Sequence, residues 1–189
     1  MQPKILQHPN IPKPLHGVNP RTIMGQSWWE KTRQEAYESN NFHCLACGVH
    51  KNEARYYSRL EAHENYTIDY CTGTVKVTDI IPLCHSCHNF IHSGRLWMIS
   101  KTDSQIKKTC EILKHGFDIL KANKLCAFSG TIWVAEELGV KHKCKELKQK
   151  HPEIPIEWGS WKLIFNKQSY HSKFKNIKEW ADFYSKTNI

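Results

Sequence analysis

Long apolar runs are missing from this sequence of 189 residues. The first twenty residues contain no apolar stretch of the signal-peptide type, and no later segment approaches the about 20 apolar residues of a transmembrane helix. There is also no internal repeat and no low-complexity tract. We therefore expect a cytoplasmic protein without membrane association, whose cysteines stay reduced and can bind metal.

Acidic residues are few as well. The chain has 18 Asp and Glu against 27 Lys and Arg, and residues 101–189 carry most of the excess, with a net charge of +7 against +2 for residues 1–100. A basic excess in one half indicates a polyanionic partner, most economically nucleic acid. Lysines that only solvate helix faces would give the same composition, so charge alone does not decide between the two.

We expect three successive regions. Five of the eight prolines fall in the first twenty residues, which predicts an extended, proline-rich arm over residues 1–25. Residues 26–100 should form the central domain. It would begin with a helix that Ser27 opens through a capping box with Glu30.

After that helix, the alternation of apolar and polar residues predicts two antiparallel strands within residues 55–63 and 74–78. A turn near residues 69–73 should connect them. A short helix from Cys87 to about Gly94 should follow.

Residues 101–189 form the basic region, for which the pattern predicts helices, a hairpin and a final helix. The expected elements are a helix behind a Thr102-Asp103 cap, two shorter helices over 131–138 and 141–150, a hairpin over 158–170 and a helix capped by Asn176. Strands and helices in separate runs make the predicted fold class α+β.

Two Cys-x-x-Cys pairs, Cys44 with Cys47 and Cys84 with Cys87, have the spacing of a structural zinc site. Four thiolates complete a tetrahedral Zn²⁺ site without a further ligand. The other cysteines lack this spacing and are interpreted as isolated thiols; they are Cys71, Cys110, Cys126 and Cys144.

Histidines cluster around the same segment and are not needed for that zinc. If a helix begins at Cys87, His88 and His92 are four residues apart on one face, a spacing that lets two imidazoles reach one metal ion or phosphate. His63 lies in the segment between the two cysteine pairs. The sequence therefore predicts a second site that performs chemistry, although a contact to the zinc thiolates or a surface position would also suit each histidine singly.

These residues resemble the motif of the HNH endonucleases, the zinc-binding branch of the ββα-metal or His-Me finger nucleases, with bacterial and phage members. The resemblance covers about residues 42–95. It is carried by Leu60-Glu-Ala-His-Glu64, Asp79, Leu83-Cys-His-Ser-Cys-His88 and Ile91-His-Ser-Gly-Arg95. It implies that His63, His88 and His92 are catalytic residues that hold a divalent ion such as Mg²⁺ or Mn²⁺, next to the four-cysteine zinc.

The sequence departs from the family pattern at the general base. Aligning the leading Leu-Glu places His63 at the metal-ligand position and Glu64 where the catalytic histidine usually stands. Shifting the alignment by one residue makes His63 the base and leaves Ala62 at the ligand position. A carboxylate can act as a base when its pKa is tuned, so the first alignment is preferred and both stay open.

Further candidate residues follow from the resemblance and from charge. Asp79 occupies the place of the family's middle Asn, which orients the active-site loop, although an ordinary turn carboxylate would also fit. Arg95 could hold a phosphate oxygen, or lie on the surface. The lysines expected to contact nucleic acid are Lys141, Lys143, Lys145 and Lys148.

Together these features predict a metal-dependent endonuclease that hydrolyses phosphodiester bonds in DNA. The main alternative is a non-catalytic, zinc-dependent nucleic-acid-binding protein that retains the HNH fold. The glutamate at position 64, where the family has its catalytic histidine, favours this alternative. A third interpretation is a zinc protein that mediates assembly with another protein.

Overall fold

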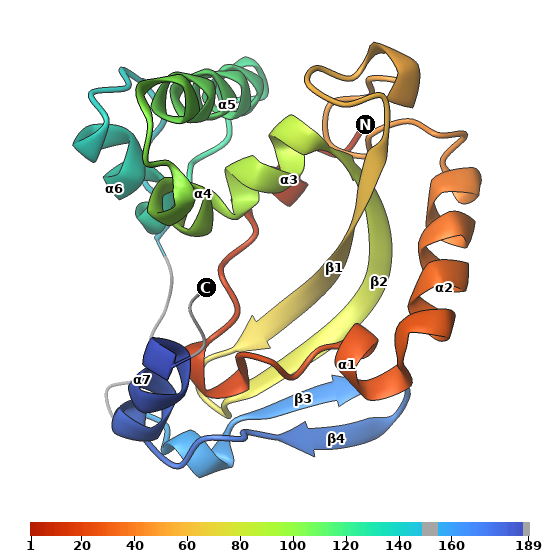
Figure 1. Ribbon diagram of the computed structural model, residues 1–189, viewed down its shortest axis with the longest axis vertical. Helices are drawn as coiled ribbons and strands as arrows, with labels where there is room; N and C mark the ends of the chain where they lie inside the picture. Colours follow the sequence, from red (N-terminus) through yellow and green to blue (C-terminus); the bar gives the residue numbers. More distant parts are fainter. Residues whose placement is uncertain (149–154, 187–189) are drawn as a thin grey trace. The chain divides into compact units, whose positions relative to one another are not determined.

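The computed structural model describes residues 1–148 and 155–186 and has a mixed α+β fold (Figure 1). The predicted α+β class is confirmed. Four strands form one sheet in the order β1-β2-β3-β4, with neighbouring strands joined by hydrogen bonds. They are β1 (Leu60–Asp69), β2 (Thr74–Cys84), β3 (Lys162–Phe165) and β4 (Gln168–His171).

Seven α-helices and four short 3-10 helices complete the described part of the chain. The α-helices are α1 (Pro20–Met24), α2 (Gln26–Ser39), α3 (His85–Ile91), α4 (Ser93–Ile99), α5 (Asp103–Ala122), α6 (Ser129–Glu137) and α7 (Ile177–Lys186). The 3-10 helices are η1 (Pro3–Gln7), η2 (Lys13–Leu15), η3 (Lys51–Glu53) and η4 (Trp158–Ser160).

The chain divides into two compact units, each assembled from separate segments. Unit 1 contains residues 1–10, 33–63 and 80–148, and unit 2 contains residues 11–32, 64–79 and 149–189. These units are interleaved along the sequence. The three successive regions expected from the sequence stay a prediction.

The hairpin of β1 and β2 turns where the sequence indicated. The Asp69 carboxylate accepts a hydrogen bond from the backbone N–H of Cys71 at 2.9 Å, which closes the turn. Gly73 then adopts a φ of +64°, a conformation that costs glycine little because it has no Cβ. β1 begins at Leu60, five residues later than predicted, and extends to Asp69, so residues 55–59 are not part of a strand. β2 begins at Thr74 as predicted but continues to Cys84 at the start of α3.

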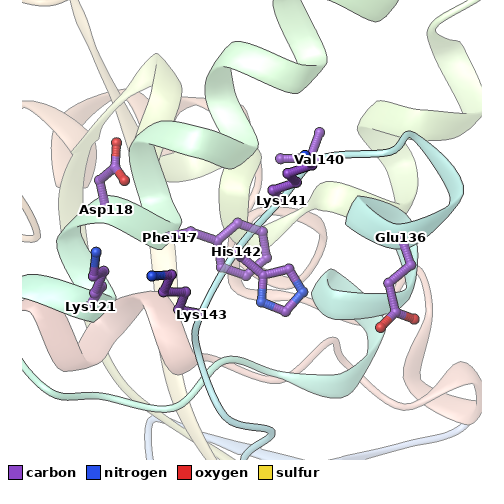
Figure 2. Close-up of a pocket in the computed structure, with 8 residues that line it drawn as sticks. All are labelled: Phe117, Asp118, Lys121, Glu136, Val140, Lys141, His142 and Lys143. Carbon is purple, nitrogen blue, oxygen red and sulfur yellow. The ribbon is translucent and has the colours of Figure 1, made fainter.

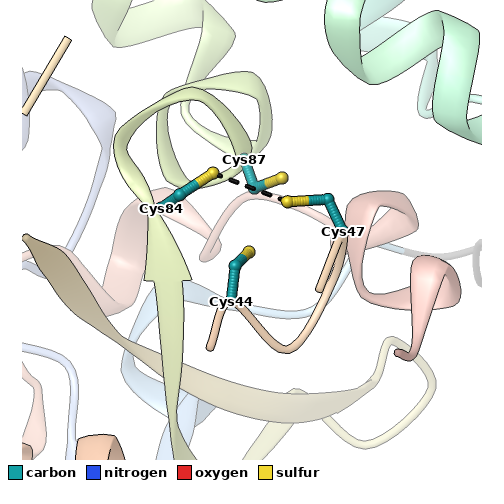
Figure 3. A group of neighbouring side chains, drawn as sticks. All are labelled: Cys44, Cys47, Cys84 and Cys87. Carbon is teal, nitrogen blue, oxygen red and sulfur yellow. Dashed lines mark hydrogen bonds between the residues drawn. The ribbon is translucent and has the colours of Figure 1, made fainter. Parts of the chain in front are cut away.

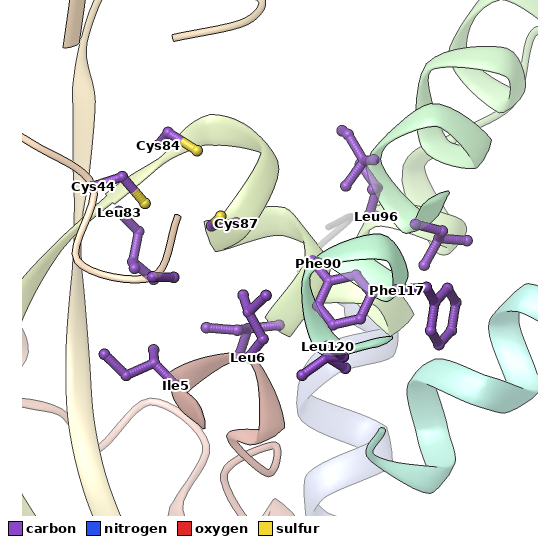
Figure 4. Close-up of a cluster of buried hydrophobic side chains, with 14 of the residues drawn as sticks. Ile5, Leu6, Cys44, Leu83, Cys84, Cys87, Phe90, Leu96, Phe117 and Leu120 are labelled. Atoms are coloured by element: carbon purple, nitrogen blue, oxygen red, sulfur yellow. The ribbon is translucent and has the colours of Figure 1, made fainter. Parts of the chain in front are cut away.

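Unit 1 has one hydrophobic core, formed where α3 and α5 pack against η1 (Figure 4). The apolar face of α5 supplies Leu113, Phe117 and Leu120, all buried. Phe90 of α3 is fully buried against them, and its ring meets Phe117 edge to face at 5.3 Å. Full burial of a side chain of this size stabilises the fold by about 1.5–3 kcal/mol, so α5 is anchored by several such contributions.

Gly116 lets α5 approach α3. A Cβ at position 116 would lie 2.1 Å from a ring carbon of Phe90, far inside van der Waals contact. We expect Gly116→Ala to lower the free energy of unfolding by about 1–3 kcal/mol or more, despite the better helix propensity of alanine. Gly94→Ala is the matched control, because nothing lies within 4 Å of its Cβ position. Urea denaturation of both variants checks this; equal stability would contradict the close packing.

Unit 2 is built on the C-terminal hairpin, which the sequence predicted. Trp161, Leu163 and Phe165, at alternate positions, are buried in its core. The two connecting residues, Asn166 and Lys167, both have positive φ, at +49° and +62°, which is typical of a type I′ hairpin turn. β3 also pairs in parallel with β2 at residues 74–76.

Two predicted helix caps are present. The Thr102 hydroxyl accepts from the backbone N–H of Gln105, and the Gln105 side chain accepts from the N–H of Thr102, which forms a capping box at the start of α5. The Asn176 side chain accepts from the backbone N–H of Glu179 at 3.0 Å at the start of α7. Both helices therefore begin where the sequence indicated.

The amino-terminal segment differs from the expected extended arm. It contains η1, η2 and α1, each with a proline at one of its first two positions, where the fixed φ suits a helix and the missing N–H leaves no bond unmade. Ile5 and Leu6 are buried in the core of unit 1. Leu15 and Val18 are buried in the core of unit 2.

Three smaller expectations were wrong. Ser27 lies inside α2, which already begins at Gln26. Gly94 does not end the helix, because α4 starts at Ser93 and includes it. Residues 141–148 form no helix, because their backbone bonds Ala127 instead. The N–H of Ala127 donates to the carbonyl of Lys145 at 2.8 Å, and the N–H of Leu147 donates to the carbonyl of Ala127 at 2.7 Å. The remainder of that predicted helix lies outside the described residues.

No helix in residues 1–148 or 155–186 combines the length and apolar character needed to cross a bilayer.

Candidate metal centres

The four cysteines predicted to bind zinc lie together in unit 1 (Figure 3). Cys44 and Cys47 belong to a tight turn, and Cys84 and Cys87 lie at the end of β2 and in the first turn of α3. All four sulfur atoms are within 4.8 Å of one another, and those of Cys47 and Cys84 are 3.8 Å apart. Tetrahedral coordination with Zn–S bonds of about 2.3 Å requires sulfur atoms about 3.8 Å apart, so the cluster fits Zn²⁺.

Backbone hydrogen bonds hold the two cysteine pairs in place. The N–H of Gly48 bonds the carbonyl of Cys44, and the N–H of Cys44 bonds the carbonyl of Val49, both at 2.8 Å. The N–H of Leu45 reaches across to the carbonyl of Pro82, also at 2.8 Å, and so ties one pair to the strand that carries the other. The sulfur positions are thus set by backbone geometry.

The electrostatics of the cluster also suit a bound cation. Side-chain hydrogen bonds from Cys44, and then from Cys84 and Cys87, lower the pKa of Cys47 well below its usual value. The corresponding interactions with Cys44 and Cys47 raise the pKa of Cys84 far above it. Four crowded sulfur atoms cannot all carry negative charge by themselves, whereas a divalent cation would stabilise all four thiolates.

His115 of α5 lies beside the cysteine cluster. Its Nε2 is 3.8 Å from the sulfur of Cys87, within the reach of a hydrogen bond to sulfur. Such outer contacts tune the charge and orientation of metal ligands. The sequence analysis missed His115, because 28 residues separate it from Cys87.

The second cluster brings together His63, His88 and His92, also in unit 1. One ring nitrogen from each lies within 4.8 Å of the others. His63 belongs to β1, His88 to α3, and His92 is the residue that caps α3, with its N–H bonded to the carbonyl of His88 at 3.2 Å. The spacing of four residues therefore places the last two imidazoles on one face, as the sequence indicated.

A carboxylate fixes the orientation of His88. Glu61 Oε2 is 2.6 Å from Nδ1 of His88, and Glu61 Oε1 is 2.8 Å from Nδ1 of His85. Burial alone would raise the pKa of Glu61, but the hydrogen bonds from the two histidines outweigh it and hold the pKa below its usual range. An ionised Glu61 accepts a hydrogen bond from Nδ1–H of His88; in the tautomer with only this proton, Nε2 carries the lone pair that can bind a metal.

Burial favours the neutral form of the other two imidazoles. His63 is only 1% exposed, and this burial lowers its pKa well below the usual value. Electrostatic interactions with His92 and then His8 lower it further. Burial, and then electrostatic interactions with His88 and Arg95, lower the pKa of His92 to about 3. Neutral imidazole is the form that binds metal, so the donor set fits a divalent transition-metal ion.

Among the described residues, these two clusters are the groups of three or more His, Cys, Asp or Glu side chains close enough to share an ion. Comparisons of the chain with family models, curated proteins and solved structures found no match. The HNH resemblance therefore rests on the sequence motif alone.

A fourth imidazole, which the sequence analysis did not select, adjoins the second cluster. His8 is 7% exposed, and its Nδ1 lies 3.4 Å from Nε2 of His63. It comes from the residues just after η1, 55 positions before His63. Because Ile5 and Leu6 are buried in the same core, the amino-terminal segment is anchored in a position that presents His8 here.

The remaining residues predicted by the resemblance are not members of either metal cluster. Glu64 is half-buried and follows His63 in β1, where successive side chains point to opposite faces. Asp79 is exposed within β2 rather than in a loop. Arg95 is exposed in α4, and its charge helps to lower the pKa of His92.

The predicted nucleic-acid lysines lie in an irregular segment after α6. Lys141 and Lys143 line a cavity of about 550 Å³, together with Lys121 and two carboxylates (Figure 2). His142 lies in the same cavity and stacks on Phe117, with ring centroids 4.4 Å apart. Lys145 and Lys148 are exposed but do not line this cavity.

Proposed function

We propose that this protein is a metal-dependent endonuclease of the HNH type, which hydrolyses phosphodiester bonds in DNA on a ββα-metal core. The observation that carries the proposal is the convergence of His63, His88 and His92 within 4.8 Å, next to a four-thiolate cluster. The residues that form both clusters come from β1, β2, α3 and the segments beside them. This order of two strands and a helix is the one that the HNH resemblance implies.

The two metal clusters would have different roles. The cysteines would hold a structural Zn²⁺ with no open position, whereas three histidines leave room for water or substrate. His63, His88 and His92 would hold a divalent ion such as Mg²⁺ or Mn²⁺, which would supply positive charge to neutralise the scissile phosphate and the departing oxygen. Glu61 would hold His88 in the orientation that binds the metal ion.

The other residues are assigned roles by the resemblance. Glu64 would take the proton from the attacking water, Asp79 would orient the surrounding backbone, and Arg95 would hold a phosphate oxygen. The lysines after α6 would contact the DNA backbone, which adds affinity without sequence information. They are Lys141, Lys143, Lys145 and Lys148.

A metal-screened cleavage assay tests this function. We expect the wild-type protein to nick supercoiled plasmid with Mg²⁺ or Mn²⁺, and His63→Ala to lose this activity. His171→Ala is the matched control, because His171 is exposed in β4 and belongs to neither cluster. Parallel reactions with single-stranded DNA and RNA define the substrate. Absence of cleavage of every substrate with every metal would contradict the proposal.

A non-catalytic nucleic-acid-binding protein is the second candidate, and Glu64 at the family's base position is the observation that favours it. Such a protein would retard plasmid mobility in a gel without nicking the DNA. A zinc protein that assembles with another protein would do neither.

A further inference from the structure

His8 is a buried imidazole that belongs to neither metal cluster. It is 7% exposed, and among the described residues the other buried histidine is His63, at 1%. Nδ1 of His8 lies 3.4 Å from Nε2 of His63, and the two rings meet edge to face with centroids 5.0 Å apart. Burying a polar ring costs free energy unless it forms a hydrogen bond. Each of these two rings therefore provides a polar partner for the other.

Contacts on both sides of His8 fix its position within unit 1. The N–H of Gln2 donates to the carbonyl of Leu45, within the first Cys-x-x-Cys pair, at 2.7 Å. The side chain of Gln7 donates to the carbonyl of Cys126 at 2.8 Å. Between these two bonds, η1 packs against α3 and α5. The segment is thus tied to three separate parts of the unit, and it holds the imidazole of His8 against His63.

The two ring nitrogens of His63 face different neighbours. Nδ1 is 3.3 Å from Nε2 of His92, so it is the nitrogen on the side of the metal cluster, whereas Nε2 faces His8. Neutral imidazole has one N–H and one lone pair, so a ring that binds a metal through one nitrogen carries its proton on the other. Ligation through Nδ1 would therefore leave an N–H at Nε2, beside Nδ1 of His8.

We propose that His8 is a positioning residue of the candidate metal centre. It accepts a hydrogen bond from Nε2–H of His63 and so holds Nδ1 of that ring toward the ion shared with His88 and His92. Glu61 holds His88 in the same way, at 2.6 Å from its Nδ1. Partners of this kind fix the orientation of a ligating imidazole and raise its basicity. The assignment deepens the proposed function and rests on it, because it takes His63 as a metal ligand.

Binding of Mn²⁺ to the zinc-loaded protein, without nucleic acid, tests the inference by calorimetry. We expect His8→Leu, which fills a similar volume and has no acceptor, to lower the Mn²⁺ affinity about 10–100-fold. His8→Asn should recover most of the affinity, because its side-chain oxygen is an acceptor close to the position of Nδ1. His50→Leu is the matched control, because His50 is half-buried in unit 1 and belongs to neither cluster.

A purely structural role for His8 would give a different pattern. Leucine would then preserve the packing and the Mn²⁺ affinity, and asparagine, which is smaller, would preserve them less well. Zinc content and a thermal melt show for each variant that unit 1 is folded. Equal Mn²⁺ affinity in the wild-type protein and His8→Leu, or an equal loss in His8→Leu and His8→Asn, would overturn the positioning role.

The measurement also separates this role from the nuclease function, because Mn²⁺ affinity is determined without cleavage. Weakened Mn²⁺ binding in His8→Leu, recovered in His8→Asn, in a protein that cleaves no substrate would support the role of His8 and contradict the nuclease. Cleavage by the wild-type protein, together with unchanged Mn²⁺ affinity in His8→Leu, would overturn the role of His8 and leave the nuclease proposal intact.

Discussion

Cys84→Ser is expected to yield a protein that does not fold cooperatively. Cys84 is buried at the junction of β2 and α3, where its sulfur is 3.8 Å from that of Cys47. Structural zinc contributes an apparent about 10–16 kcal/mol in zinc-finger peptides, whereas whole domains are stable by only about 5–15 kcal/mol. Loss of even part of the zinc-binding free energy should therefore exceed what the remaining core of unit 1 can offset.

Elemental analysis and a thermal melt check this expectation. The wild-type protein should contain about one tightly held zinc ion per chain, and the melt of Cys84→Ser should lose its cooperative transition. Cys71→Ser is the matched control, because Cys71 is exposed and lies outside the cluster. A cooperative melt with full zinc content in Cys84→Ser would refute the structural role of the cluster. His92→Ala should keep both the fold and the zinc.

The sequence predicted best those features that depend on nearby residues. The Cys-x-x-Cys spacing, the Thr102 cap and the hairpin after Trp161 each follow from backbone geometry over a few positions, and the structure contains all of them. The spacing of His88 and His92 is local in the same sense. Their approach to His63 also depends on the position of β1, and only the resemblance to the HNH motif indicated it.

Contacts between distant segments were missed for a physical reason. His8 meets His63 across 55 positions, and His115 meets Cys87 across 28, and neither pair has a spacing that a periodic pattern would mark. The side-chain bridge from Glu61 to His85 likewise depends on how β1 lies beside α3. Such pairs become visible only when the packing of Leu6 and Phe90 has fixed the segments that carry them.

The error over residues 141–148 has a different origin. The lysine-rich composition of this segment favours a solvated helix. In the structure, however, an isolated β-bridge between Ala127 and Glu146 takes up backbone hydrogen bonds of the segment. Long-range hydrogen bonds outweighed a weak local preference, since helix propensities differ by less than about 1 kcal/mol per residue. The lysines that were expected along one helix are therefore divided between a cavity and an exposed strand-like segment.

Glu64→Gln is expected to reduce cleavage by about 10²–10⁴-fold, the usual contribution of a general base. The amide keeps the shape of the side chain and loses its basicity, so binding of metal and DNA should persist. His63→Ala should instead weaken binding of the catalytic metal, because His63 shares its cluster with His88 and His92. Single-turnover cleavage rates, measured beside Mn²⁺ and DNA affinities, distinguish the two effects.

The opposite pattern would reverse the preferred alignment of the motif. Near wild-type cleavage by Glu64→Gln, together with an inactive His63→Ala that still binds Mn²⁺, would make an imidazole the base. The strand geometry gives this outcome a physical basis, since Glu64 and His63 are successive residues of β1 and point to opposite faces. His8→Ala would then decide which imidazole acts, because Nδ1 of His8 is 3.4 Å from Nε2 of His63 and the two rings are neighbours in the same buried group. Full activity of His8→Ala would assign proton abstraction to His63 itself.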